Sequence, residues 1–169
     1  MGWISIEDDH WTVDAMVDIF GQERAIECWR QVLIALIDRP LLGNFFSSMV
    51  RVFGLSPISV VRLLVKGWPL VYRELCDPKL IAAADGQPTI RFENIAPAVQ
   101  RYSNYLHCWH GVCRGYAAIA GVRGDVTFEV ADDLTWAEAR FFWEDERDEA
   151  TEPTLRRYKP SERTPPSGR

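Results

Sequence analysis

The chain has 169 residues, a net charge of −5 and 47% hydrophobic residues, which fits one globular domain with a sizeable core plus an appendage. The acidic balance and the lack of a basic stripe in the body argue against a general nucleic-acid binder. The apolar runs at 32–37 and 68–72 are far shorter than the roughly 20 residues of a membrane span. The acidic first ten residues lack the apolar stretch of a signal peptide. We therefore expect a cytoplasmic protein with no membrane insertion, no nucleic-acid partner and reduced cysteines.

The N-terminal half predicts four helices, from apolar residues at helical spacing and from cap residues at their ends. In chain order they cover 12–21, 22–39, 41–54 and 56–75. The first should begin at Thr12 and stop at Gly21, and the fourth should begin at Ser56. Pro69 should kink or break the fourth helix near Gly67, because proline lacks the N–H that a helix needs.

The C-terminal half predicts two β-hairpins around one long helix. Asp85-Gly86 is a turn signal, and Ile90 and Phe92 after it alternate with polar residues as in a half-buried strand. A helix should run from Pro97 to about residue 121, and a second hairpin should follow over 126–143. The fold class is therefore α+β, with N-terminal helices and an antiparallel sheet of two β-hairpins flanking a long buried helix.

The domain should span residues 1–144, and residues 145–169 form a charged, Pro-rich segment with little to bury. Such a composition is typical of a flexible tail. Two interpretations of the tail stay open. It is either an inert extension or a segment that orders on a protein partner, with the partner-binding residues Arg156, Arg157, Tyr158 and Lys159.

Three stretches carry a resemblance to a known family, namely 20–33, 56–75 and 102–143. They resemble a myxobacterial paralogous family of short uncharacterised proteins. That family is similar to the superfamily of 4-vinyl-reductase-type sensor domains, TRAPP tether subunits and haem-nitric-oxide-binding domains. The resemblance implies an α+β fold, dimerisation, and a sensing or tethering role without catalysis. The haem relatives use a proximal His and a Tyr-x-Ser-x-Arg motif, but "YSNYLH" at 102–107 lacks the Arg, so haem ligation is not carried over and we expect no cofactor.

The segment "HCWHGVC" at 107–113 holds the residue types of a metal site, so its helical geometry matters. Cys108 and Cys113 lie about 140° apart around a helix, so the two thiols cannot both coordinate one metal ion. His107 and His110 share a strip with Cys113 at its edge, but two ligands are too few for a closed zinc site. Three interpretations of the two histidines stay open: a structural or solvated edge of the helix, a partial metal site, and a haem ligand. We expect no metal.

Two glycines of the predicted helix, and the tryptophans of the whole chain, concern packing. Gly111 and Gly115, on the face away from the main apolar stripe, would let another element approach closely. The seven tryptophans are unusual for the length, and they predict either an aromatic core or a pocket for a hydrophobic ligand. The candidate pocket residues are Trp29, Trp68, Tyr102, Trp109 and Trp143.

Nothing in the sequence points to catalysis. The carboxylate groups at 7–9, 132–133 and 144–149 fall in predicted turns or in the tail, as solvated charges do. No GxSxG, P-loop or GxGxxG motif is present. We therefore predict a non-enzymatic regulatory or scaffold protein that acts through protein–protein contacts, as a homodimer. The alternative is a small-molecule or metal sensor that uses the aromatic core or the His107/His110 strip.

Overall fold

The computed structural model describes residues 5–37, 39, 43–44, 48, 56–82, 87–120 and 124–143. The predicted third helix at 41–54 lies almost wholly outside the described residues, and the tail at 145–169 with Arg156, Arg157, Tyr158 and Lys159 lies entirely outside them. The described elements are α1 (Ile6–Phe20), α2 (Gln22–Ile37), α4 (Pro57–Val71), β1 (Asp77–Ala82), β2 (Thr89–Glu93), α5 (Pro97–Arg101), α6 (Tyr105–Ile119), β3 (Gly124–Val130) and β4 (Ala137–Trp143).

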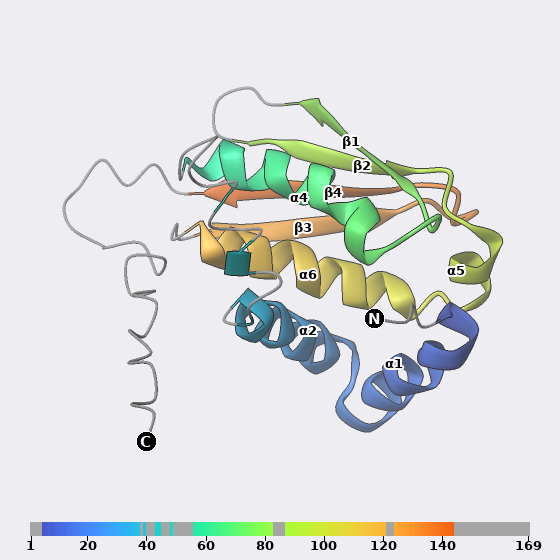
Figure 1. Ribbon diagram of the computed structural model, residues 1–169. Helices are drawn as coiled ribbons and strands as arrows, with labels where there is room; N and C mark the ends of the chain where they lie inside the picture. Colours follow the sequence, from blue (N-terminus) through green and yellow to red (C-terminus); the bar gives the residue numbers. More distant parts are fainter. Residues whose placement is uncertain are drawn as a thin grey trace, which may run out of the picture.

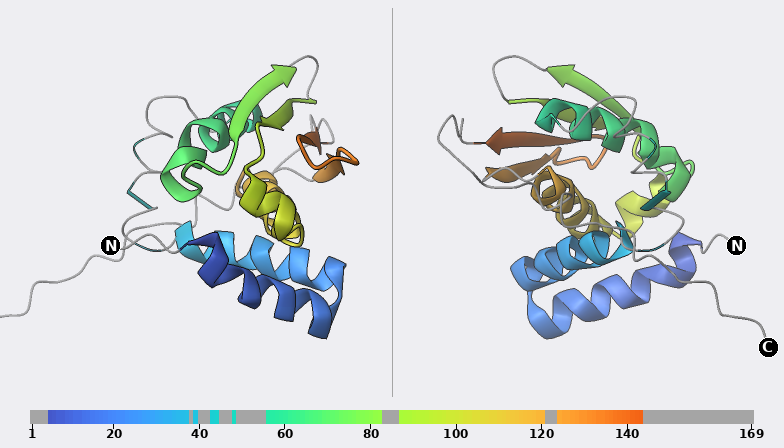
Figure 2. Two further views of the ribbon diagram at one scale, coloured as in Figure 1. Left: turned by 90° about the vertical axis from the view of Figure 1, so that its right-hand side faces the viewer. Right: turned by 60° about the vertical axis from the view of Figure 1, so that its left-hand side comes forward.

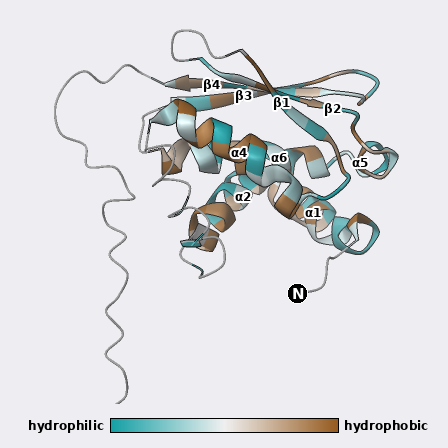
Figure 3. Cartoon of the chain, turned by 45° about the horizontal axis from the view of Figure 1, so that its top comes forward, coloured by the Kyte–Doolittle hydropathy of each residue, from teal (hydrophilic) through white to brown (hydrophobic). Residues whose placement is uncertain are grey.

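The elements form three layers (Figure 1). The sheet lies on one side, α4 and α6 cover one of its faces, and α1 and α2 pack against the far side of α6, as the two views in Figure 2 show from other directions. Figure 3 shows hydrophobic residues on the helices of both layers. The α+β prediction is confirmed. Within the described part of the chain, every helix is too short or too polar to span a bilayer.

Local cap chemistry sets most helix ends. Gly21 ends α1 with a φ of 78°, a conformation that favours glycine, and Ser56 caps α4 by accepting from the Ser59 N–H at 3.3 Å. The predicted start of α1 at Thr12 is wrong. Ser5 caps the helix instead, accepting from the Glu7 N–H, and the acidic first turn complements the helix dipole.

Two expectations about breaks differ from the structure. Of the two alternatives at Pro69, a break near Gly67 is wrong, since α4 continues through Pro69 to Val71, and a kink stays a prediction. Proline lacks an N–H, so α4 continues without the backbone hydrogen bond that residue 69 would otherwise donate one turn back. The expected single helix at 97–121 is instead α5 and α6. Tyr102 leaves helical geometry with φ −111° and ψ 60°, and its ring stacks on His10 of α1 at 3.9 Å.

Both predicted hairpins are present and join into one antiparallel sheet. Its strand order is β1-β2-β4-β3, so β2 and β4 pair in the middle. One face buries Ile90, Phe92 and Phe141 against the helices. Charged pairs occupy the strands at other positions, among them Arg91 Nη1 to Glu138 Oε1 at 2.8 Å.

The core centres on α6, which contacts the sheet, α4 and α2. The close approach predicted at the two glycines is confirmed, and the partner is α2. A Cβ added at Gly111 would lie 2.6 Å from Trp29 Cβ, and one added at Gly115 would lie 2.8 Å from Leu33 Cδ2. The close contact between α2 and α6 therefore depends on having glycine, which has no side chain, at positions 111 and 115.

Candidate functional site

An apolar cavity of about 220 Å³ lies among α2, α4 and α6. Its walls are stripes of side chains three or four residues apart on each helix, which is the spacing of one helical face. A cavity remains where three such faces meet without filling the space between them. The described residues that line it are Asp9, Trp29, Val32, Leu33, Leu36, Gly67, Trp68, Val71, Tyr72, Tyr105, Cys108, Val112 and Tyr116.

The rim of this cavity is apolar. Val32 is 38% exposed, Leu36 41% and Val71 49%, and all three belong to its lining. Apolar side chains at this exposure are costly to leave in water. An apolar molecule that entered between α2 and α4 would cover them.

Five polar side chains of the lining form hydrogen bonds, whereas the indole N–H of Trp29, also in the lining, is buried without a hydrogen-bond partner among the described residues. Tyr105 Oη donates to Asp9 Oδ2 at 2.6 Å, and Tyr72 Oη lies 3.3 Å from Cys108 Sγ. Trp68 Nε1 donates to Cys76 Sγ at 3.1 Å. These pairs satisfy polar atoms that would otherwise be unpaired in an apolar wall.

Burial keeps the hydroxyl and thiol groups of the lining protonated. It raises the pKa of the Cys108 thiol to about 12, and it raises the pKa of Tyr72, Tyr105 and Tyr116 above the usual value of a tyrosine. The Asp9 carboxylate adds to the shift at Tyr105. Asp9 is therefore the only charged side chain among the described residues of the lining.

The candidate pocket residues from the sequence separate in the structure. Trp29 and Trp68 lie in the cavity wall. Trp109 is fully buried on the sheet side of α6, with ring centroids 5.4 Å from Trp68 and 5.5 Å from Phe92, so it fills the core. Tyr102 stacks on His10, and Trp143 lies half-buried at the end of β4.

Sequence reasoning missed the polar part of the lining. Asp9 was assigned with its neighbours to solvated turns, and that assignment is wrong, because 7–9 form the first turn of α1 and Asp9 lines the cavity. Tyr72 follows α4 and gave no signal of its own. Cys108 and Val112 also line the cavity. Helical spacing puts them on the same face of α6 as Gly111 and Gly115, and neither was among the candidate pocket residues.

His110, in the histidine strip, has a local structural role. His110 Nε2 donates to the Val126 carbonyl at 2.9 Å and its ring stacks on Phe128 at 5.3 Å. Burial lowers the pKa of both His107 and His110. Among the described residues, no three His, Cys, Asp or Glu side chains gather as metal ligands would, and neither histidine lines the apolar cavity.

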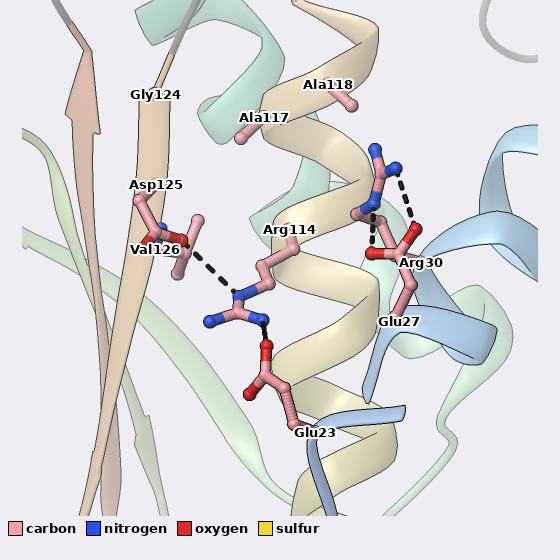
Figure 4. A pocket seen from close by; sticks show the side chains of 9 residues that line it. All are labelled: Glu23, Glu27, Arg30, Arg114, Ala117, Ala118, Gly124, Asp125 and Val126. Atoms are coloured by element: carbon pink, nitrogen blue, oxygen red, sulfur yellow. Dashed lines mark hydrogen bonds and ion pairs between the residues drawn. The ribbon is translucent and has the colours of Figure 1, made fainter. Parts of the chain in front are cut away.

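A second, polar cavity of about 580 Å³ lies where α2, α6 and β3 meet (Figure 4). Its two arginines are already paired with carboxylates. Arg30 makes a bidentate contact with Glu27 at 2.7 and 2.8 Å, and Arg114 contacts Glu23 and, at 3.4 Å, Asp125. An anionic ligand would have to displace these partners, so the cluster is better explained as a link between α2, α6 and β3.

Comparisons with known proteins show the fold and nothing finer. No family model matches the chain, and no curated protein does. A variant of the unliganded Fe(II) H-NOX protein from K. algicida aligns at 10% identity over 86% of this chain and 77% of that one, with a TM-score of 0.59. A variant of Tt H-NOX aligns at 13% identity over 90% and 79%, with a TM-score of 0.50.

A trafficking protein particle complex subunit 3 from Naegleria fowleri, covalently bound to palmitic acid, aligns at 14% identity over 83% of this chain and 95% of that one, with a TM-score of 0.49. The two H-NOX alignments bear on the fold alone. They agree with the broader part of the resemblance seen in the sequence. This chain therefore has an α+β fold similar to that of H-NOX proteins.

Proposed function

We propose that this chain is a ligand-binding domain of the sensor type, and that its ligand is a small apolar molecule held among α2, α4 and α6. The observation that carries the proposal is the 220 Å³ cavity, lined mainly by aromatic and aliphatic side chains with a few polar groups. Small-molecule sites have this composition. A dry apolar cavity of about 150 Å³ is already large enough to bind benzene.

The likeness to H-NOX proteins supports a ligand-binding role but not iron. The residues of the cavity do not fit an iron group, because none of the chain's three histidines lines it. The thiol of Cys108 and the lining tyrosines are held protonated by burial, and a protonated thiol or phenol is a poor metal ligand. Membership of the narrower myxobacterial family stays a prediction from sequence.

The test is a titration with 1-octanol, followed by tryptophan fluorescence and by native mass spectrometry. Trp29 and Trp68 lie in the wall, so binding should change the emission saturably, and the mass should show one ligand per chain. Val112→Phe should abolish binding, because the larger ring fills the cavity.

Val17→Phe is the matched control, since Val17 is half-buried on α1 and does not line the cavity. Circular dichroism should show that both variants are folded. Absence of saturable binding to the parent chain, or equal binding to a folded Val112→Phe variant, would refute the proposal.

A second candidate function is the regulatory or scaffold role through protein contacts, with a homodimer and without catalysis. One observation favours it: α1 exposes Trp11 and Ile19, each at 71%, and Phe20 at 52%. Exposed apolar groups of this size are common at protein interfaces. Native mass spectrometry of the parent chain and of Trp11→Ser tests it. If both samples are monomeric at micromolar concentration, the homodimer proposal fails and only the ligand-binding proposal remains.

A further inference from the structure

The apolar cavity has one charged end. Asp9 lies in the first turn of α1, half-buried, and accepts a hydrogen bond from Tyr105 Oη at 2.6 Å. One carboxylate oxygen is engaged in this bond. A carboxylate accepts several hydrogen bonds, so Asp9 keeps capacity for a donor from a bound molecule.

No positive side chain balances Asp9 in the described lining, which contains no lysine, arginine or histidine. The arginines Arg30 and Arg114 line the other cavity, where carboxylates already pair with them. The other polar side-chain groups of the described lining are neutral: tyrosine hydroxyls, the Cys108 thiol and two indole N–H groups, of which Trp29 Nε1 has no hydrogen-bond partner in the described part of the chain. A negatively charged head group inside this cavity would therefore face the like charge of Asp9, with no cationic side chain in the described lining to balance it; the neutral N–H donor of Trp29 does not cancel that charge.

Resting on the proposed function, we infer that the cavity selects an apolar molecule with a hydrogen-bond-donating head group, an amine or a hydroxyl, and discriminates against a carboxylate of the same length. The amine is the better match, because opposite charges within a few ångströms attract and like charges repel. The alcohol donates a hydrogen bond but carries no charge, so it should rank between the two.

The volume sets the size of the ligand. In proportion to benzene, whose six carbons occupy a cavity of about 150 Å³, a cavity of 220 Å³ holds roughly nine non-hydrogen atoms. Octylamine and 1-octanol have about nine non-hydrogen atoms and octanoate about ten, so all three are close to this size. Each has an unbranched skeleton of eight carbons, and they differ mainly in the head group. They separate head-group preference from chain length.

The experiment titrates the full chain with these three compounds at pH 7.5, with tryptophan fluorescence for affinity and native mass spectrometry for stoichiometry. Octylamine should bind most tightly, 1-octanol less tightly, and octanoate at least about tenfold more weakly than octylamine. Because the whole chain is acidic, binding must also be saturable, one to one, and lost in Val112→Phe.

Asp9→Asn should bring the affinities of octylamine and octanoate together, since it removes the charge and keeps the side-chain shape. The matched control is Asp8→Asn, which removes the same charge from an exposed neighbour that does not line the cavity. It should leave the ratio unchanged. Tyr105→Phe keeps Asp9 charged and should preserve the preference for octylamine even if Asp9→Asn is unstable.

The outcomes are separable. If octanoate binds as tightly as octylamine, or if Asp9→Asn changes the ratio no more than Asp8→Asn does, the head-group inference is overturned and the proposed function stands. If none of the three compounds binds, the proposed function fails and the inference fails with it.

Discussion

The contact between α2 and α6 has almost no spare volume at Gly111. A Cβ at this position would lie 2.6 Å from Trp29 Cβ and 3.2 Å from the Arg30 backbone nitrogen, and it would overlap the carbonyl oxygen of Ile26. These three atoms belong to the backbone or are attached to it, so no side-chain rotation relieves the overlap. The substitution Gly111→Ala therefore has to move α2 away from α6.

Two opposing terms set the magnitude. Overpacking a well-packed contact costs about 1–3 kcal/mol, whereas replacing glycine by alanine inside a helix favours folding by about 0.8–1 kcal/mol. The backbone character of the obstacles places the first term in the upper part of its range. We expect Gly111→Ala to lower the free energy of unfolding by about 1–2 kcal/mol, and the melting temperature by about 2–8 °C for a domain of this size.

Gly115→Ala is the matched control, one helical turn further along. Its nearest obstacle is Leu33 Cδ2 at 2.8 Å, a terminal methyl group that rotates aside. The fixed atoms, Leu33 Cβ at 3.1 Å and the Arg30 carbonyl oxygen at 3.2 Å, lie further away than the two nearest obstacles at Gly111. The helix-propensity gain should then offset most of the strain, so stability should stay near that of the parent chain. Gly115→Leu, by contrast, should cost roughly 1–3 kcal/mol or more. Thermal unfolding and urea unfolding followed by circular dichroism measure all three. A Gly111→Ala variant as stable as the parent chain would refute the packing argument.

Four further outcomes are expected. At pH 8 a disulfide reagent should modify one thiol rapidly, the exposed Cys28, while Cys108, whose pKa burial raises to about 12, reacts only on unfolding; rapid reaction at both would contradict this. Burial lowers the pKa of His110 in the folded state, so on acidification the unfolded chain binds a proton at His110 before the folded chain does. The free energy of unfolding should therefore fall as the pH drops below about 6.5, until the pH reaches the folded-state pKa. His110→Gln should flatten the melting temperature between pH 5 and 7 relative to the parent chain. Elemental analysis should find no stoichiometric zinc or iron, and about one metal per chain that is lost in His107→Ala would contradict the sequence argument. Truncation after Ala150 should leave the melting temperature unchanged, and a large drop would move the domain boundary.

Much of the fold could be predicted because its signals are local. Gly21 and Ser56 act through bonds within one helical turn, and strands β2, β3 and β4 each alternate apolar and polar residues along the chain. The expectations that failed depended on distant contacts. Tyr102 ends α5 while its ring stacks on His10, which is about ninety residues away in the sequence and gives no local sign.

The candidate site illustrates a stronger limit. Trp68 and Trp109 both lie on apolar stripes at helical spacing, and their rings are 5.4 Å apart, yet one faces the cavity and the other fills the core. The spacing of apolar residues indicates which face of a helix is buried. It does not indicate whether the neighbouring helix packs directly against that face or leaves a cavity there. That depends on the separation of the helices, which the glycines of α6 set on the α2 side.

Asp9 follows the same logic from the polar side. Three acidic residues in a row near the start of a chain are typical of solvated charge, and two of the three, Glu7 and Asp8, are exposed. Helical geometry turns the third toward Tyr105, because residues one apart on a helix lie about 100° apart. Asp8 and Asp9 are neighbours on α1, yet Asp8 is exposed to solvent and Asp9 is the only charged side chain in the described cavity lining. The comparison of Asp9→Asn with Asp8→Asn is therefore the sharpest test of what the cavity selects.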